Sequence, residues 1–339
     1  MRGAFASLEN MITVYGEGLV DLVPSQNNPL SPLVPALGGG PFNVAVVLAR
    51  QGAKVAFQSR VSEDNYGDAL MRRLEEEGVD TSGVQRGPEP TTLAVTTIDQ
   101  EGSASYNFYC EGTADRLVEP AAVDCDIACF GTCSLAWEPG ASRYIEVLHR
   151  HAAAGRLVAL DPNIRPDFAT DAHRERLLGL LDDVNLLKLS EEEVEFFGGI
   201  DRLRVSSVEA IVTTRGGAGL SLDCGELHLD VPAHHTEVSD TIGAGDTIMG
   251  SLLAAIERAG LNAGQLGQAT ESQWHEILTL AAAAAAITCS RTGAQPPTLD
   301  EVAAELGRWP SPTPGRPTSR RRPGACPGRC SGRAPSRGR

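Results

Sequence analysis

Residues 240–247 have the sequence DTIGAGDT, in which a glycine-rich turn leads directly into a carboxylate at the start of an apolar helical run. Gly243 and Gly245 flank a single alanine, so the backbone can come close to a ligand there. The first N–H groups of a helix lack intrahelical partners and attract an anion such as phosphate. Asp246 adds a negative charge beside this anion site, which suits a base that accepts the proton of a hydroxyl. The stretch therefore predicts phosphoryl transfer to an alcohol.

A second glycine-rich motif lies near the N-terminus, where residues 38–45 have the sequence GGGPFNVA. Successive glycines allow the main chain at Gly39 and Gly40 to pass against a polyol. Asn43 carries both a donor and an acceptor, which recognition of a sugar hydroxyl needs. The motif is not a dinucleotide-binding fingerprint, because Asn43 stands where that pattern has its third glycine.

Each motif also has a purely structural interpretation. Asp246 would then only cap a helix over residues 247–259, because aspartate is a favoured N-cap residue. In the same way, Asn43 would cap a helix over residues 42–51 at the end of a glycine-rich turn. The two interpretations differ in where these side chains point, which a structure can decide.

Both motifs resemble the signatures of the ribokinase-like sugar kinases, also called the phosphofructokinase B family. The resemblance covers roughly residues 11–300, and the segments FYCEGTAD (108–115) and DPNIRP (161–166) are most similar to bacterial fructokinases. It implies a three-layer α/β/α domain over residues 11–307, with a mainly parallel sheet and a small β-sheet lid formed from about 15–40 and 89–115. It also implies an ATP-dependent kinase that transfers the γ-phosphoryl group of MgATP to a primary hydroxyl of a monosaccharide, with fructose favoured.

The resemblance assigns roles to residues of this chain by their positions in the motifs. Asp246 is the expected catalytic base, and the amides of Gly243, Ala244 and Gly245 form an anion hole. The expected sugar-binding residues are Asp21, Gly39, Gly40, Asn43, Phe108 and Arg165. The expected residues on the ATP side are Lys188, Glu193, Thr214, Gly216 and Gly219. Glu193 would order the water shell of Mg²⁺, and main-chain oxygens of Asp240, Ile242 and residues 288–293 would hold K⁺.

Ordinary local structure is an alternative explanation for several of these residues. Asp21 would be an acidic residue in a turn at a strand end, and residues 161–166 a turn held by Asn163 and two prolines. Residues 214–219 would be a plain hairpin turn. Ser190 replaces the asparagine of the family's Asn-x-x-Glu motif, and the glutamates at 191–193 would also suit the start of a helix.

The motifs do not identify the substrate, so other functions remain open. A 2-keto-3-deoxygluconate kinase would have the same fold and motifs, but it needs cations for the substrate carboxylate, and the lid segment offers only Arg116. A ribokinase is a further alternative. An alternative of a different class is a non-catalytic sugar sensor, which would have no reason to keep Asp246 beside an anion hole.

Strand-like and helical segments alternate along the chain. We expect strands at residues 12–15, 19–20, 55–60, 127–130, 157–160, 186–189 and 210–213. We expect helices at residues 42–51, 66–77, 142–154, 173–181, 191–197 and 247–259. This alternation predicts a mainly parallel sheet covered on both faces, with ligands at the carboxyl ends of its strands. Residues 93–97 and 103–109 alternate with period two around a turn at 99–102, which predicts a hairpin.

The composition of the chain limits where in the cell the protein can lie and which partners it can have. Of 339 residues, 42% are hydrophobic, which is enough for one large core. No apolar run approaches the ~20 residues that cross a bilayer, and residues 1–10 lack the core of a secretory signal. We therefore expect a cytoplasmic protein with no membrane partner. The family resemblance implies that it binds sugar and ATP and that, like many relatives, it forms a homodimer through its lid.

The two ends of the chain differ from the middle in composition. Residues 1–10 precede Met11 and are expected to be an extension. Residues 308–339 contain nine arginines and no acidic residue, whereas the whole chain has 44 acidic against 29 basic residues. This Pro-, Gly- and Arg-rich segment is expected to be a disordered tail, because it has almost no apolar side chains with which to form a core. It lacks interleaved aromatic residues, so we expect no nucleic-acid partner.

Overall fold

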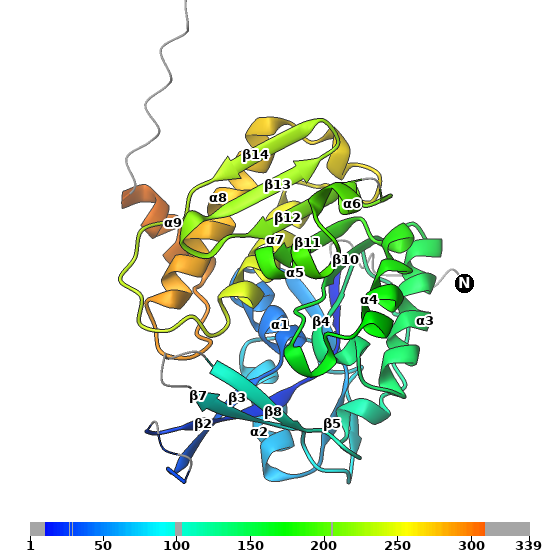
Figure 1. Cartoon of the computed structure of the whole chain (residues 1–339), viewed down its shortest axis with the longest axis vertical. Coiled ribbons are helices and arrows are strands. Elements are labelled where there is room, and N and C mark those ends of the chain that lie inside the picture. The colour runs from blue at the N-terminus through cyan, green and yellow to red at the C-terminus, as the bar shows by residue number, and fades with distance from the viewer. Residues whose placement is uncertain (1–10, 27, 29, 99–103, 205, 309–339) are drawn as a thin grey trace, which may run out of the picture.

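The computed structural model describes residues 11–26, 28, 30–98, 104–204 and 206–308. An eight-stranded central sheet carries helices on both faces, and a separate four-stranded sheet lies beside it (Figure 1). This architecture confirms the predicted α/β fold with a second small sheet. The extension at 1–10, the turn at 99–102 and the tail beyond 308 lie outside the described residues and stay predictions.

The central sheet has the strand order β14-β13-β12-β11-β10-β9-β1-β4. Its strands are β1 (Met11–Tyr15), β4 (Lys54–Gln58), β9 (Ile127–Gly131), β10 (Leu157–Asp161), β11 (Leu186–Ser190), β12 (Ala210–Thr214), β13 (Leu220–Cys224) and β14 (Leu227–Val231). The strands from β4 to β12 are parallel, and β13 and β14 are antiparallel at one edge. The strand expected at 55–60 is divided at Ser59, because the chain leaves the central sheet there. Its second part, β5 (Arg60–Ser62), pairs with β6 (Gln85–Gly87).

Two hydrophobic cores lie on opposite faces of this sheet, because successive strand residues point to opposite sides. One core is covered by α1 (Gly40–Arg50), α2 (Asn65–Glu76), α7 (Ala244–Arg258) and α8 (Glu271–Cys289). The other is covered by α3 (Gly140–Ala153), α4 (Asp171–Leu178), α5 (Glu191–Phe196) and α6 (Ile200–Arg204). The last helix, α9 (Leu299–Arg308), packs on α8. Over the described ranges, none of the helices combines the length and the apolar character needed to cross a membrane.

The four-stranded sheet, called the small sheet below, has the order β3-β2-β7-β8. Its strands are β2 (Leu19–Pro24), β3 (Leu33–Gly38), β7 (Leu93–Ile98) and β8 (Ala104–Tyr109). The predicted hairpin is confirmed, since β7 and β8 pair in antiparallel fashion. Strand β2 joins this hairpin to the N-terminal glycine motif, because it pairs with β7 on one side and with β3 on the other.

The two helices that carry the motifs begin earlier than predicted. Pro41 starts the first turn of α1, where its fixed φ suits a helix, so Asn43 lies inside the helix. Helix α7 starts at Ala244 after Gly243, which has a φ of 77° in the left-handed region that favours glycine. Asp246 is therefore also inside a helix. Neither Asn43 nor Asp246 is a helix cap, so the interpretation of these two residues as caps is wrong.

Candidate active site

Two cavities meet over the first turn of α7. The first, here called the polar cavity, has a volume of about 640 Å³ and lies between the small sheet and the strand ends of the central sheet. The second, here called the apolar cavity, has a volume of about 480 Å³. Thr241 and Gly245 line both. The two cavities therefore adjoin at the amino end of α7, where the sequence predicts an anion hole.

The predicted residues are distributed between the two cavities as follows. The polar cavity is lined by Asp21, Gly39, Gly40, Asn43, Phe108 and Arg165, and by Asp240, Ile242, Gly243, Gly245 and Asp246. The apolar cavity is lined by Thr214, Gly216, Gly219, Ala244 and Gly245. Lys188 and Glu193 line neither cavity. All residues expected to bind sugar thus lie on one side of α7, and the glycine turn expected to bind ATP lies on the other.

Asp246 lines the polar cavity, and only 8% of it is exposed. Its Oδ2 accepts a hydrogen bond of 2.8 Å from Nδ2 of Asn43 on α1. Burial raises the pKa of Asp246 to about 6; the bond from Asn43 opposes this shift and the charge of Asp161 adds to it. A carboxylate with this pKa is ionised at neutral pH and can still accept a proton readily, as a general base requires.

Helices α1 and α7 are held together closely, which fixes Asn43 against Asp246. A Cβ atom on Gly250 would lie 2.6 Å from Cβ of Val47, so only glycine permits this approach. Gln51 Nε2 also donates a 2.6 Å hydrogen bond to Ser251 Oγ, and both side chains are buried. Ser251 of α7 therefore has a polar partner immediately after the end of α1.

Asp21, Gly39 and Gly40 form another wall of the polar cavity. Burial raises the pKa of Asp21 to about 6, with a further increase from the charge of Asp246, and Arg165 opposes it. A Cβ on Gly38 would lie 2.2 Å from Asp21 Oδ2, and one on Gly40 would lie 2.3 Å from Cγ2 of Thr132. A side chain at either glycine would therefore displace Asp21 or Thr132, both of which line the cavity.

The third wall combines a cation with aromatic rings. The Arg165 guanidinium lies 5.7 Å from the ring centroid of Tyr106 on β8. Phe108, two residues further along the same face of β8, packs edge to face on Trp137. Arg165 is the one cationic side chain among the described residues that line this cavity. Arg116, the cation expected in the lid, lies elsewhere and pairs with Glu111.

Lys188 lies behind the first turn of α7. A Cβ on Gly245 would lie 3.1 Å from Lys188 Nζ, so the ammonium group is adjacent to the predicted anion hole. It is buried and forms a 2.8 Å ion pair with Asp161 Oδ2. Burial opposes the charge of Lys188, but the combined attraction of Asp161, Glu193 and Asp246 outweighs it and raises the pKa. The second oxygen of Asp161 is buried and has no hydrogen-bond partner among the described residues.

Glu193 has a clear local role in this fold. Its Oε2 accepts from the backbone N–H of Ser190 at 2.7 Å, which completes a capping box at the start of α5. Its Oε1 accepts from the backbone N–H of Ile164 at 2.6 Å. The predicted helix start at 191–193 is therefore confirmed, and the role of Glu193 toward magnesium stays a prediction.

The Asp240 carboxylate joins the two segments expected to hold a monovalent cation. Its Oδ1 accepts from the Ile242 N–H at 3.0 Å and its Oδ2 from the Gly293 N–H at 2.8 Å. In addition, the backbone N–H groups of Ser239 and Asp240 donate to the Cys289 carbonyl. Residues 240–242 and 288–293 thus contact each other directly, as the resemblance implies.

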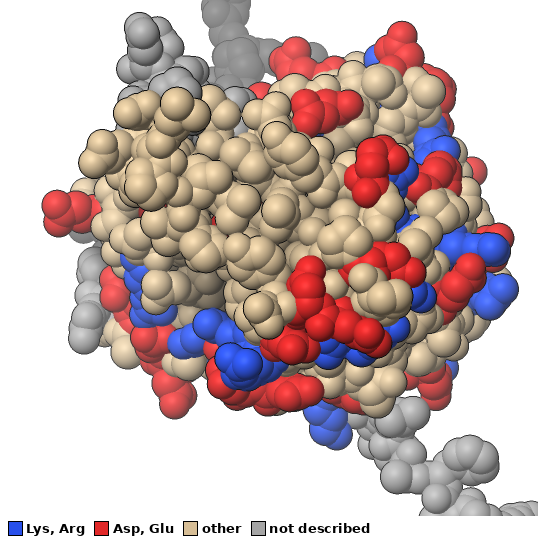
Figure 2. Space-filling model, turned by 90° about the horizontal axis from the view of Figure 1, so that it is seen from below, with Lys and Arg blue, Asp and Glu red and all other residues tan. Residues whose placement is uncertain are grey.

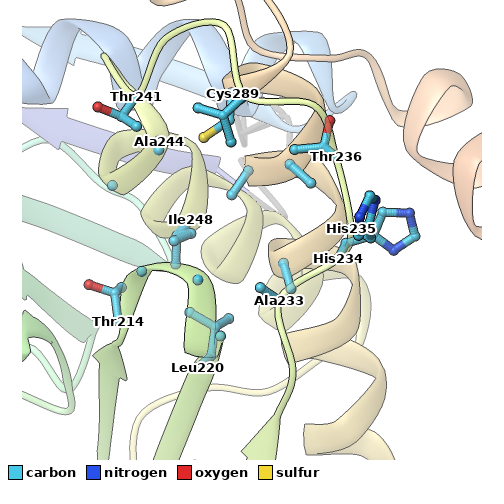
Figure 3. A pocket seen from close by; sticks show the side chains of 18 residues that line it. Thr214, Leu220, Ala233, His234, His235, Thr236, Thr241, Ala244, Ile248 and Cys289 are labelled. Atoms are coloured by element: carbon cyan, nitrogen blue, oxygen red, sulfur yellow. The ribbon is translucent and has the colours of Figure 1, made fainter.

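Main-chain turns and small side chains form the apolar cavity. In Figure 3, Thr214 and Leu220 lie on one side of it, Thr241 and Cys289 on the other, and His234 and His235 at one end. Residues 215–219 connect β12 with the antiparallel β13, so the turn is a hairpin and lines a cavity as well. Gly219 has a φ of 97°, and a Cβ there would lie 2.1 Å from the Val231 carbonyl oxygen. Glycine is therefore required at this turn.

Several residues of the site were not predicted from the sequence. The missed residues are Glu17, Tyr106, Thr132, Asn163 and Asp161, the first four of which line the polar cavity. Tyr106 could have been found, because it alternates with Phe108 along one strand. The others follow or end separate strands, and no local pattern distinguishes them from ordinary turn residues.

Comparison with known proteins agrees with this geometry. A family model described as pfkB family carbohydrate kinase matches residues 9–301. A fructokinase of Rhizobium leguminosarum bv. trifolii is 34% identical over 262 residues, which cover 73% of this chain and 80% of that protein. The probable fructokinase-4 of Arabidopsis thaliana is 30% identical over 88% of this chain and 97% of its own length.

A solved structure has the same fold over nearly the whole molecule. The fructokinase of Xylella fastidiosa with bound ATP superposes with a TM-score of 0.81 and 28% identity, over 88% of this chain and 99% of that one. The predicted family resemblance is thereby confirmed. The chain belongs to the pfkB family of carbohydrate kinases.

Proposed function

We propose that this protein is an ATP-dependent kinase that phosphorylates a primary hydroxyl of fructose. The observation that carries the proposal is the junction of the two cavities at Gly245, with the buried carboxylate of Asp246 on the polar side. A group that enters from one cavity can there meet a hydroxyl that enters from the other. The relatives described above are named as fructokinases, and one of them holds ATP.

The polar cavity has the groups that a neutral sugar needs. We propose that Asp21 and the backbone of Gly39 and Gly40 bind sugar hydroxyls, with Phe108 against the apolar face of the sugar. Asn43 donates its amide N–H to Asp246, so its amide oxygen is the atom that would accept from the sugar. The same hydrogen bond orients the Asp246 carboxylate toward the cavity.

ATP would lie in the apolar cavity, where it supplies the phosphoryl group. The wall residues Thr214, Gly216 and Gly219 offer small side chains and main chain close to the phosphates. The amides of Gly243, Ala244 and Gly245 at the start of α7, with Lys188 behind them, supply a positive potential where the γ-phosphoryl group would lie.

Asp246 accepts the proton of the sugar hydroxyl as that oxygen forms its bond to phosphorus. The bond between phosphorus and the bridging oxygen of ADP breaks, and the proton remains on the carboxylate. Lys188 and Arg165 offset negative charge on the two sides of the reacting centre. The small sheet, which we propose acts as a lid, excludes water that would otherwise compete as acceptor.

The donor set near the anion hole fits magnesium. Mg²⁺ usually binds through one or two carboxylates together with phosphates and keeps several waters. The unpartnered oxygen of Asp161 fits that chemistry better than Glu193, both of whose oxygens accept backbone N–H groups. We therefore propose Asp161, with Glu193 behind it, as the magnesium-side carboxylates. For K⁺ we propose main-chain oxygens of Asp240, Ile242 and residues 288–293.

A 2-keto-3-deoxygluconate kinase is the second candidate. It is favoured by one observation, which is that the Arg165 guanidinium lies in the polar cavity, where it could meet a carboxylate. Against it, the same cavity holds the carboxylates of Glu17, Asp21 and Asp246, which would repel an anionic substrate.

Coupled ATP turnover tests the proposal with fructose, 2-keto-3-deoxygluconate, ribose, adenosine and fructose 6-phosphate, each with magnesium and with or without potassium. Turnover with fructose above the others is the expected result. Turnover with another acceptor would leave the proposed role of Asp246 intact but would show that fructose is not the substrate. Sugar binding without ATP consumption would refute the kinase and favour a sugar sensor.

We also propose that the small sheet forms the contact of a homodimer. Leu19, Asp21 and Val23 line the polar cavity, so the alternate residues Leu22 and Pro24 face outward. This side of the molecule has a broad area without charged side chains, bordered by acidic and basic residues (Figure 2). Light scattering tests the contact, and a Leu22→Glu variant should be monomeric.

A further inference from the structure

Two residues that are not glycine adopt a positive φ within the described parts of the chain. They are Thr132, with a φ of 61°, and Asn163, with a φ of 43°. Both line the polar cavity, just beyond the neighbouring strands β9 and β10. Asparagine tolerates this conformation, whereas a β-branched residue such as threonine rarely adopts it. Unusual backbone of this kind persists only where surrounding contacts hold it, which is most often at functional sites.

The contacts that hold Thr132 come from Glu17. The Oε1 atom of Glu17 accepts a hydrogen bond from the Thr132 hydroxyl. Its Oε2 accepts from the Ser134 hydroxyl and from the Ser134 backbone N–H, the latter at 3.1 Å. Glu17 therefore holds Thr132 and Ser134, the two residues that flank Cys133.

Glu17 is an unusual residue for a purely structural role. It is 1% exposed, and no cationic side chain forms an ion pair with it among the described residues. A buried carboxylate without a cation destabilises a fold unless its hydrogen bonds compensate, and a neutral residue could fill the same space. Its presence where it lines the polar cavity points to a function.

The other side of Thr132 faces the reacting centre. A Cβ on Gly40 would lie 2.3 Å from Thr132 Cγ2 and 3.4 Å from Asp246 Oδ1. The Thr132 methyl group thus packs against the backbone that adjoins the proposed base. A rotation of Thr132 away from Glu17 would change the cavity wall beside Asp246.

We propose that Glu17 is a positioning residue that supports sugar binding through Thr132. Glu17 accepts a hydrogen bond from the Thr132 hydroxyl and so stabilises the left-handed backbone conformation of Thr132. A hydroxyl whose hydrogen is already donated can only accept, so Thr132 Oγ1 accepts a hydrogen bond from a sugar hydroxyl. This inference rests on the proposed function, because it concerns the sugar side of the same site.

A double-mutant cycle tests the inference with Glu17→Gln, Thr132→Gly and the double variant. Thr132→Gly should fold, because glycine adopts the left-handed conformation readily. We measure KM for sugar, KM for ATP and kcat, together with the sugar Kd by calorimetry. Each single variant should raise the sugar KM and Kd at least tenfold and leave the KM for ATP and kcat within threefold. The sugar KM and Kd of the double variant should be no higher than those of either single variant, because the two substitutions remove the same interaction.

Asp115→Asn is the matched control. Asp115 is also buried and accepts from two threonine hydroxyls, those of Thr92 and Thr113, but it does not line the polar cavity. It should lower the unfolding temperature and leave the sugar KM unchanged.

Three results would overturn the inference. They are an unchanged sugar Kd in Glu17→Gln, additive effects in the double variant, and an equal loss of sugar binding in the Asp115 control. The calorimetric cycle does not depend on turnover. A wild-type protein that binds sugar without consuming ATP would thus refute the proposed function and still decide whether Glu17 acts through Thr132.

Discussion

The two cavities on either side of α7 are built in different ways. The polar cavity is formed by ionisable and aromatic side chains from the small sheet, α1, α7 and the ends of β9 and β10. The apolar cavity is formed by glycine turns, alanines of α8 and only a few polar side chains. Side chains that point into a cavity select a ligand by its functional groups, whereas main chain and small residues select it by shape. Single substitutions should therefore act strongly in the first cavity and weakly in the second.

Asp246→Asn should have the largest effect. The amide keeps the shape and the contact with Asn43 but cannot accept the hydroxyl proton, so kcat should fall by about 10²–10⁴-fold. The sugar Kd should stay within a few-fold, because the cavity wall is unchanged. Rapid-quench turnover and calorimetry measure the two quantities. A variant with more than a tenth of wild-type kcat would show that Asp246 is not the base.

Lys188→Met tests whether the cation behind α7 serves the reaction or only the fold. Breaking its buried pair with Asp161 should reduce stability by about 3–5 kcal/mol, because a buried charge is left alone. It should also lower kcat/KM for ATP about 10²-fold, as removal of an oxyanion contact does. Urea unfolding and initial rates measure these effects.

The double variant Lys188→Met with Asp161→Asn separates the two roles of this pair. Removing both charges should restore most of the stability, because neither charge then remains buried alone. Turnover should stay low. Recovery of turnover together with stability would show that the pair only supports the fold.

The pH dependence of activity should reflect Asp21 and Asp246, two of the carboxylates that line the polar cavity. The pKa values of Asp21 and Asp246 are about 6, above the ordinary value of about 3.9. Protonated Asp246 cannot act as base, so kcat/KM should fall as the pH decreases through about 6. A profile that is flat between pH 5 and 7 would contradict this assignment.

Folding stability should change in the opposite direction over the same range. A carboxyl group whose pKa is raised by folding stabilises the fold while it is protonated, so this stabilisation is complete below about pH 4 and is lost as the pH rises through about 6. Urea titrations of Asp246→Asn should therefore show a weaker decrease of unfolding free energy than wild type between pH 4 and 7. An identical slope in the two proteins would rule out a raised pKa at this residue.

Thr214→Ala should have the smallest effect. The Thr214 side chain lines the apolar cavity, where glycine backbone forms much of the same wall. KM for ATP should rise by no more than about threefold and the sugar KM should not change, because one exposed neutral hydrogen bond contributes roughly 1 kcal/mol at most. A tenfold rise would show that side chains determine binding in this cavity as well.

Burial explains some of the element predictions but not all of them, because the buried strand β13 and the buried helix α8 were not predicted. The strands at 127–130, 157–160, 186–189 and 210–213 were predicted closely, because they are buried on both faces and form unbroken apolar runs. Strand β3 was not predicted, because it is an exposed edge strand interrupted by Pro35. The starts of α1 and α7 were predicted too late, because Gly40 and Gly245, which were assigned to the preceding turns, lie within the helices.

The sequence by itself determined the fold class, the two glycine motifs and the identity of the buried carboxylate at 246. These features depend on short-range properties, namely the alternation of apolar residues and the backbone freedom of glycine. Only the tertiary structure decided that Asn43 donates to Asp246, that Asp161 pairs with Lys188 and that Glu17 holds Thr132. These partners are 203, 27 and 115 residues apart, respectively. Such pairs meet because the parallel sheet places the carboxyl ends of separate strands at one edge and because α1 packs on α7. No local pattern encodes which side chains then become neighbours.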